Sequence, residues 1–407
     1  MKKLASFLLA GLLFLSLTQR VQAEERFWPI QAIDTMKFSR DASRQPLGQE
    51  FIDKEIKNIA DTGANYVAID TPYDSEFLPR LREWVNSARK YHVNVWFRGN
   101  WSGWEGWFNY PKSLTREDHL NKTRGFILQN PDLFQNGDIF TACPECENGG
   151  PGDPRSTSDI EGFRQLMIDE YQVTNNSFKQ IGKQVSSNYD SMNRDVARLI
   201  MDPSTTSNLG GIVTIDHYVS NPNELSSAVV GISTKSDGQV VLGEFGAPIP
   251  DINGPMTDEQ QSNWLSTALS DLVNQPQLVG LNYWVDTGGS TALWNSDGSP
   301  REAVAVLTKF YKPDQISGTA TDESGNRISN LQISYLGRNY SGDNQGNFQL
   351  PYLSDKTEII FSADKYKPLT LLTGDLIAKK QVVLEKTSLS LWDYLALTWL
   401  KIKGFLF

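Results

Sequence analysis

The regular alternation of short apolar runs with amphipathic helical stretches is the feature that most restricts how this chain can fold. Runs that are rich in β-branched residues and separated by helices are typical of parallel strands buried on both faces. The predicted strands cover residues 29–38, 65–70, 93–98, 138–143, 184–190, 211–219, 239–245 and 278–285.

A helical stretch follows each of these runs. The predicted helices cover residues 49–61, 76–91, 116–129, 159–181, 194–201, 223–232, 257–274 and 300–311. Eight strand-then-helix units in about 285 residues are what a (β/α)8 barrel requires. An open doubly wound sheet is the alternative, but the glycine-rich turn usual after its first strand is missing from the sequence. We therefore predict an α/β fold with a (β/α)8 TIM barrel over residues 27–312.

The first 23 residues have the pattern of a signal peptide. Lys2 and Lys3 form a basic start, residues 4–17 are apolar, and Val21-Gln22-Ala23 is a small-residue cleavage pattern. An uncleaved membrane anchor is the alternative. We expect the protein to work outside the cytoplasm, either secreted, periplasmic or at the cell surface.

The charge balance restricts the partners of the chain. It has 38 Lys and Arg against 48 Asp and Glu, which gives a formal net charge of -10. A nucleic-acid partner would require a basic face, so we expect none. An acidic surface is also simply typical of soluble proteins.

The composition changes after the predicted barrel, and residues 315–386 show the two-residue alternation of strands. Turn sequences at 322–326 and 343–347 separate the runs, which predicts a small β-sandwich. The opening of this module, from Gly318 through Asp322 and Gly325 to Ile328, resembles carboxypeptidase-regulatory-like modules. That resemblance implies a spacer or binding module without a second active site.

The last segment, residues 389–407, is rich in Leu, Trp and Phe and places its polar residues on one side of a helical wheel. Such an amphipathic helix suits a membrane interface. A marginal membrane span and packing on the protein itself are the alternatives.

The chain has two cysteines, Cys143 and Cys146. In an oxidising compartment such a pair can close a small local disulfide. Free thiols are the alternative, and a zinc site would need further ligands.

Acidic side chains occur at the ends of the predicted strands, where barrel enzymes hold their catalytic groups. Glu244 emerges from an apolar strand between Gly243 and Gly246, while Glu145 and Glu147 follow the fourth strand. Two carboxyl groups across a cleft are what glycosidic cleavage needs, because one protonates the leaving oxygen and the other attacks or stabilises the sugar carbon. The pair needs no cofactor and no metal.

Aromatic residues that suit sugar rings follow the third and eighth strands. The loop after strand three carries Trp101, Trp104 and Trp107 beside the polar Asn100, and Trp284 follows strand eight. We expect this polar, tryptophan-rich loop to contact a carbohydrate, although tryptophan clusters are more often part of a core.

The sequence Gly243-Glu244-Phe245-Gly246, the sequence Asp216-His217-Tyr218 and Trp284 resemble the retaining, cellulase-like glycoside hydrolases of clan A. The resemblance implies that Glu244 is the nucleophile, that His217 or Tyr218 positions it, and that Trp284 forms the floor of the sugar site.

The resemblance also implies an acid/base glutamate after strand four, where the sequence departs from the family pattern. Pro144 stands where the family usually has Asn, and an Asn instead follows Glu147. We assign the acid/base to Glu145, with Glu147 as the alternative.

Other polar residues at the strand ends have two interpretations each. Arg98 hydrogen-bonds the nucleophile or a sugar hydroxyl, or it forms a surface salt bridge. Asp34, Asp70 and Asp74 bind hydroxyls or cap loops, and His119 is expected in an exposed helix with a structural role. The sequence thus predicts a glycoside hydrolase acting on a poly- or oligosaccharide. An inactive carbohydrate-binding barrel and a transglycosylase that uses the same residues are the alternatives.

Overall fold

The computed structural model describes residues 25–387 of the 407-residue chain. The predicted signal peptide at 1–23 and the predicted amphipathic helix at 389–407 therefore lie outside the described residues. Within 25–387, no helix is long and apolar enough to cross a membrane.

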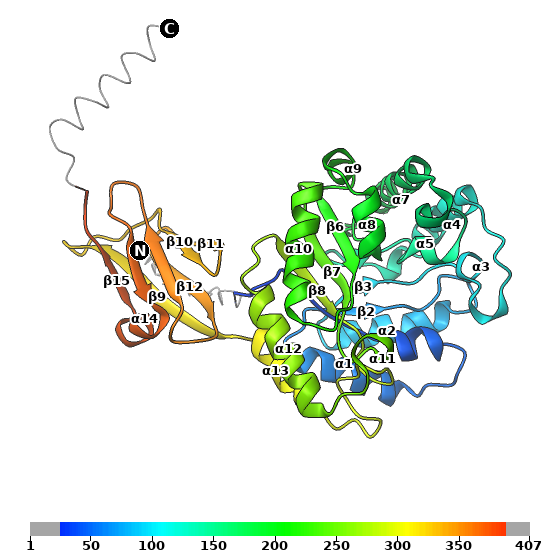
Figure 1. Cartoon of the computed structure of the whole chain (residues 1–407), viewed down its shortest axis with the longest axis horizontal. Coiled ribbons are helices and arrows are strands. Elements are labelled where there is room, and N and C mark those ends of the chain that lie inside the picture. The colour runs from blue at the N-terminus through cyan, green and yellow to red at the C-terminus, as the bar shows by residue number, and fades with distance from the viewer. Residues whose placement is uncertain (1–24, 388–407) are drawn as a thin grey trace, which may run out of the picture.

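Residues 30 to 283 contribute a parallel eight-stranded sheet that curls into a barrel, with its helices on the outside (Figure 1). The strand order is β4-β3-β2-β1-β8-β7-β6-β5. The strands are β1 (Ile30–Asp34), β2 (Tyr66–Ile69), β3 (Asn94–Phe97), β4 (Ile139–Phe140), β5 (Ser191–Asn193), β6 (Ile212–Asp216), β7 (Gln239–Phe245) and β8 (Leu278–Tyr283). The main helices are α1 (Gln49–Asp61), α2 (Leu78–Lys90), α4 (Arg116–Gln129), α7 (Ile160–Gln180), α8 (Arg194–Ile200), α10 (Asn223–Ser236), α12 (Asp258–Leu272) and α13 (Glu302–Tyr311).

The barrel closes between β4 and the segment that precedes β5. The backbone of Phe140 donates to Ser186 at 2.8 Å, and Gly137 donates to Gln184 at 2.9 Å. The strand predicted at 184–190 therefore has the right place, but regular pairing begins only at Ser191. The Asp190 side chain accepts the Ala142 backbone N–H at 2.9 Å, so a side chain replaces a ladder partner in this polar segment.

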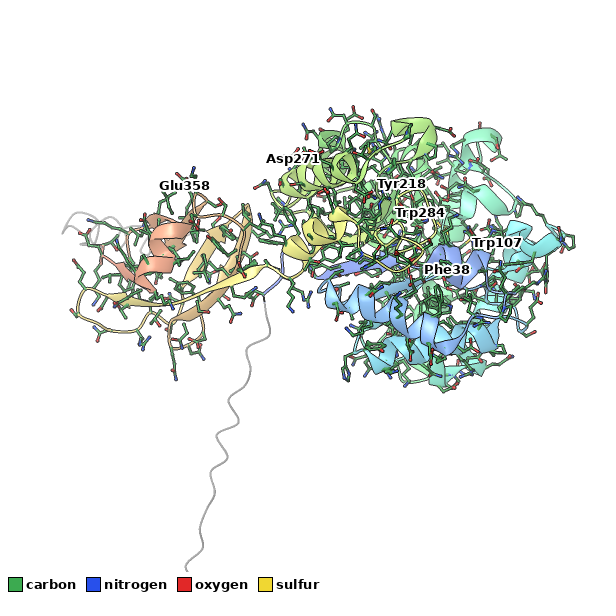
Figure 2. The ribbon with its side chains drawn as sticks, turned by 90° about the horizontal axis from the view of Figure 1, so that it is seen from below. Phe38, Trp107, Tyr218, Asp271, Trp284 and Glu358 are labelled. Carbon is green, nitrogen blue, oxygen red and sulfur yellow. A yellow bond between two sulfur atoms is a disulfide. The ribbon has the colours of Figure 1, made fainter. Side chains whose placement is uncertain are left out.

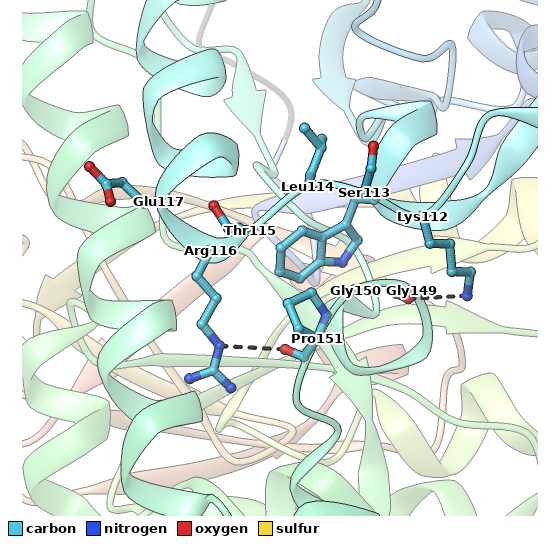
Figure 3. Close-up of a pocket in the computed structure, with 10 residues that line it drawn as sticks. Lys112, Ser113, Leu114, Thr115, Arg116, Glu117, Gly149, Gly150 and Pro151 are labelled. Carbon is cyan, nitrogen blue, oxygen red and sulfur yellow. Dashed lines mark hydrogen bonds between the residues drawn. The ribbon is translucent and has the colours of Figure 1, made fainter.

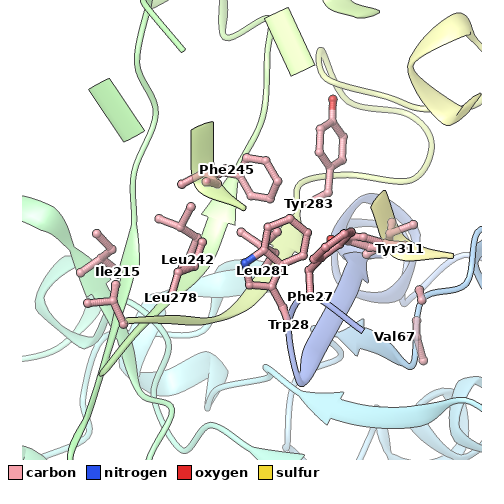
Figure 4. Close-up of a cluster of buried hydrophobic side chains, with 14 of the residues drawn as sticks. Phe27, Trp28, Val67, Ile215, Leu242, Phe245, Leu278, Leu281, Tyr283 and Tyr311 are labelled. Carbon is pink, nitrogen blue, oxygen red and sulfur yellow. The ribbon is translucent and has the colours of Figure 1, made fainter. Parts of the chain in front are cut away.

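Alternate residues of the strands build two separate apolar layers, as the two-residue period of a strand requires. Ala68, Trp96 and Val241 belong to a small cluster inside the barrel. Their strand neighbours face outward into the large core under the helices, as Figure 4 shows for Val67 and Leu242.

The residues after the barrel form two small sheets. One has the order β12-β9-β15 and the other β11-β10-β13-β14. Their elements are β9 (Asp314–Asp322), β10 (Gln332–Tyr335), β11 (Arg338–Ser341), β12 (Asn347–Tyr352), β13 (Glu358–Ser362), β14 (Leu369–Leu372), α14 (Thr373–Lys379) and β15 (Gln381–Leu384). Phe348 and Phe361 join the sheets with ring centroids 5.3 Å apart. The predicted fold class, a TIM barrel followed by a small β-sandwich, is confirmed; the resemblance to carboxypeptidase-regulatory-like modules stays a prediction.

One arginine ties the sandwich to the barrel. The Arg338 guanidinium donates four hydrogen bonds, of 2.9 to 3.3 Å, to backbone carbonyls of Phe27, Val273, Gln275 and Leu278. The sandwich is therefore attached to the barrel by hydrogen bonds from one cationic side chain to four backbone carbonyls.

We expect Arg338→Ala to weaken this attachment by about 1.5–3 kcal/mol, the usual contribution of hydrogen bonds to a charged group. Faster limited proteolysis of the connection near residues 312–315 would report the loss. Arg327→Ala, at an exposed arginine of the same module, is the matched control. Equal cleavage rates in the two variants would contradict the role of Arg338.

Candidate active site

Glu244 lies at the end of β7 and is held by two donors. Arg98, directly after β3, donates from Nη2 to Glu244 Oε1 at 2.7 Å. The Tyr218 hydroxyl, after β6, donates to Glu244 Oε2 at 2.6 Å. Burial raises the pKa of Glu244, and Arg98 and the Tyr218 hydroxyl act in the opposite direction. Both oxygens of this carboxylate are thus oriented by the protein.

Arg98 is buried among four carboxylates from four different strands. Beyond Glu244, it lies 3.4 Å from Asp216 and 3.7 Å from both Asp34 and Asp70. Its side chain has no exposed area. The surface salt bridge considered for Arg98 is therefore wrong, and its hydrogen bond to the predicted nucleophile is present.

Glu145 stands in an unusual loop after β4. Its backbone has a φ of 46°, in the left-handed region, and its N–H donates to Ser191 O at 2.8 Å. Cys143 and Cys146 form a disulfide around it. Asn148, in the short helix α5 (Cys146–Gly149), donates to Glu145 Oε2 at 3.1 Å.

Different surroundings set the pKa values of Glu145 and Glu244. Burial, followed by the charges of Glu244 and Glu147, raises the pKa of Glu145 to about 8. Glu244 has an arginine and a tyrosine hydroxyl that favour its charged form, whereas the hydrogen-bond partner of the Glu145 carboxyl is the Asn148 amide. Glu145 therefore keeps its proton at neutral pH while Glu244 is the better-stabilised carboxylate.

Glu147, the alternative acid, has a structural role. It is buried, and its Oε1 accepts the backbone N–H of Asn193 at 2.7 Å and the side-chain amide at 3.0 Å. The cavity that Glu145 and Glu244 share does not include it.

That shared cavity has a volume of about 170 Å³. Its lining includes Met36, Arg40, Asp70, Arg98, Glu105, Trp107, Pro144, Glu145, Asn148 and Glu244. Arg40 lies over the Trp107 ring, 4.9 Å from its centroid, and its Nε donates to Asp41. Sequence reasoning missed Arg40 because the strand expected at 29–38 ends at Asp34 and is followed by a helical turn at 37–41. It missed Glu105 because the tryptophan-rich loop was searched for aromatic and amide contacts only.

Asn100 does not contact the cavity, which corrects its predicted role in binding substrate. It is fully buried and donates to Glu105 Oε1 at 2.6 Å. Its own oxygen faces His119 Nε2 at 2.8 Å, and His119 Nδ1 contacts Glu170. His119 is therefore buried, where an exposed helix was expected. Asn100 positions Glu105, whose pKa burial raises to about 7.

Trp101 and Trp104 are also corrections. Trp101 is 6% exposed and Trp104 is fully buried, so neither presents a face to the shared cavity. Trp104 instead lines a different hollow together with residues 112–117 and 149–151, which Figure 3 shows. The rings of Trp101 and Trp104 are thus buried, although the loop was predicted to expose them. Of the three tryptophans in this loop, Trp107 lines the shared cavity.

Trp284 and Tyr218 lie beside each other on the barrel (Figure 2), with ring centroids 5.9 Å apart. Trp284 is half-buried, and Lys37 Nζ lies 5.3 Å from its ring centroid. Of the two candidates for positioning Glu244, the side chain that does so is Tyr218. The His217 side chain faces a separate cavity, and its link to Glu244 is its backbone N–H, which donates to the Glu244 carbonyl.

Asp34 and Asp74 follow the loop-cap interpretation, whereas Asp70 lines the shared cavity. Asp34 accepts the Met36 N–H and the Asn282 amide, at 2.7 and 3.0 Å. Asp74 caps the loop at Ser102. Among residues 25–387, no group of three or more His, Cys, Asp or Glu side chains is placed to hold a metal ion.

No protein-family model and no curated protein matches the chain. Solved structures do match its fold. A GH5_18 variant from Streptomyces cattleya in complex with Manb1-4GlcNAc has a TM-score of 0.55 at 11% identity, covering 72% of this chain and 85% of that chain. A GH5_18 variant from Bifidobacterium longum subsp. longum with the same ligand has a TM-score of 0.53 at 14% identity, covering 74% and 84%. A GH5_18 structure from Bifidobacterium longum subsp. infantis has a TM-score of 0.54 at 14% identity, covering 74% and 86%. At these identities the similarity shows the fold.

Proposed function

We propose that the protein is an exported glycoside hydrolase that cleaves a poly- or oligosaccharide by a retaining mechanism. The observation that carries this proposal is the placement of two unlike carboxyl groups on one cavity. Glu244 has a cation and a hydroxyl donor, whereas Glu145 has a pKa raised to about 8. Such a pair supplies an acid and a nucleophile at the same pH.

The roles follow from these environments. The protonated Glu145 donates its proton to the glycosidic oxygen while Glu244 attacks the anomeric carbon and forms a glycosyl-enzyme. Glu145, now a carboxylate, then removes a proton from water, which displaces Glu244 and releases the sugar. Arg98 and Tyr218 hold Glu244 in place and accept no proton in any of these reaction steps.

The size and lining of the cavity support a sugar as the substrate. A volume of about 170 Å³ is below the usual range of about 300–1,000 Å³ for sites that hold larger ligands, so it suits one ring. Trp107 lines it, and Trp284 contacts its wall by donating from Nε1 to Met36 Sδ at 3.4 Å. The two GH5_18 variants of similar fold bind Manb1-4GlcNAc, which favours an oligosaccharide here as well.

The pKa of Glu145 predicts the alkaline limit of activity. A general acid works only while protonated, so kcat/KM is expected to fall as the pH rises through about 8. The pH profile on an unactivated glycan, whose leaving oxygen needs a proton, checks this. Glu145→Gln should lose both most of its activity and this alkaline limb. An unchanged limb in that variant would assign the acid to another group.

The proposal itself is tested by screening purified protein against β-glucans, mannans and peptidoglycan-like glycans for new reducing ends. Release that depends on Glu145 and Glu244 supports hydrolysis. Binding of a glycan without any product would favour a carbohydrate-binding barrel, and longer products would indicate glycosyl transfer.

A further inference from the structure

A second cavity lies next to the side chains that hold Glu244. It has a volume of about 380 Å³ and lies where β5, α8 and the end of β6 meet. Tyr218 and Asp216 contribute to its wall, and these are the partners of Glu244 and Arg98 described above. Arg155 in its wall also connects to Glu145 through hydrogen bonds, because Arg155 donates to Asn148 at 2.9 Å and Asn148 donates to Glu145.

Three arginines line this second cavity: Arg155, Arg194 and Arg198. Arg155 pairs with Asp153 and Asp195. Within residues 25–387, the guanidinium groups of Arg194 and Arg198 have neither a salt bridge nor a side-chain hydrogen bond; Arg198 is exposed, whereas Arg194 is half-buried and its Nε is buried without a partner. For Arg194 a buried donor without a partner costs about 1–3 kcal/mol, which an anion that binds there would recover.

The acidic groups of the cavity do not balance these two cations. Asp216 is engaged by Arg98, and Asp195 by Arg155. His217 adds no charge, because burial and the neighbouring Arg194 lower its pKa to about 4. Two unpaired cations therefore face a hollow beside the catalytic pair, in a chain whose formal net charge is -10.

We propose that this second cavity binds an oxyanion, a carboxylate or sulfate carried by the sugar unit next to the cleaved bond, so that the substrate is an acidic glycan. Arg194 and Arg198 supply the charge, and their planar guanidinium groups match the oxygen geometry of either anion. The neutral His217 is in reach of the same hollow to hydrogen-bond it. The assignment rests on the proposed function, because it assumes that a sugar ring binds between Glu145 and Glu244 and that the next sugar unit reaches the second cavity.

The test measures binding to the full-length Glu244→Gln variant, so that no probe is consumed. The probes are short fragments of a neutral β-glucan, of a polyuronate and of a sulfated glycan, titrated by calorimetry at low salt. We expect at least one acidic set to bind roughly tenfold or more tightly than the neutral set, and added salt to reduce the difference. The polyuronate and sulfated arms distinguish a carboxylate from a sulfate.

Two further variants in the same background assign the binding to the cavity. Arg194→Gln with Arg198→Gln should remove the preference for acidic fragments, whereas Arg124→Gln, at an exposed arginine of α4, should keep it. Equal or tighter binding of neutral fragments, no binding of either acidic set, or a preserved preference in the double variant would each overturn the proposal. Acidic fragments that bind yet are never cleaved by the native protein would refute the hydrolase and leave the anion site standing.

Discussion

Replacing Glu244 with glutamine is expected to lower kcat on any glycan that the protein cleaves by about 10⁴-fold or more. A neutral amide cannot form the glycosyl-enzyme, so the loss falls on the chemical step, where each tenfold corresponds to about 1.4 kcal/mol. The fold should survive, because glutamine has the same shape: its amide oxygen can accept from Arg98 at the Oε1 position, and its amide N–H can donate to the Tyr218 hydroxyl oxygen at the Oε2 position.

Glu147→Gln is the matched control for this loss. Glu147 is also a buried glutamate and lies in the segment after β4, but it accepts hydrogen bonds from Asn193 and does not line the cavity that Glu145 and Glu244 share. We expect it to keep most of the activity. Steady-state rates together with circular dichroism separate lost chemistry from lost structure. Wild-type turnover in Glu244→Gln would rule out the assigned nucleophile.

Replacing Arg98 with methionine is expected to have the largest effect on stability. The side chain is fully buried and lies within 4 Å of Asp34, Asp70, Asp216 and Glu244. Removing one partner of a buried ionic cluster costs about 3–5 kcal/mol, because the other charges stay buried without compensation. Burial already raises the pKa of Asp216, and the Arg98 charge acts in the opposite direction.

Urea denaturation measures this cost, and its pH dependence tests the cause. In the Arg98→Met variant the protein must bury these carboxyl groups without a cation, and burial costs less when they are protonated and neutral. The stability lost relative to the native protein should therefore shrink as the pH falls. Arg98→Lys keeps the charge but not the fork that reaches Gly243 O and Glu244 together. It should be intermediate. A variant without Arg98 that unfolds like the native protein at neutral pH would contradict the cluster's role.

The barrel could be predicted because its strands are continuous apolar runs whose ends carry polar groups. Strand β7 was predicted with its observed limits, and the parallel order places Glu244 opposite Arg98, 146 residues away. Glu145 was preferred over Glu147 from its register, and the structure puts it on the cavity.

The rest of the site depends on how loops turn, which local patterns do not specify. Trp101, Trp104 and Trp107 look alike in the sequence, yet two are buried and one lines the cavity. Arg40 reaches the cavity from a helical turn at 37–41 that the strand pattern did not suggest. Asn100 was read as a ligand contact because a polar residue in a loop carries no sign of its buried partners.

The disulfide between Cys143 and Cys146 closes a short ring, and this ring bears on how the turn that carries Glu145 is held. It encloses two residues, one of them Glu145 in a left-handed backbone that costs a non-glycine residue about 1–2 kcal/mol. A covalent link across this turn offsets that cost and holds the acid over the cavity. Disulfides form in oxidising compartments. We therefore expect the turn that carries Glu145 to respond to the redox state of its surroundings, whereas the barrel, which this short ring does not cross-link, keeps its fold without the bond.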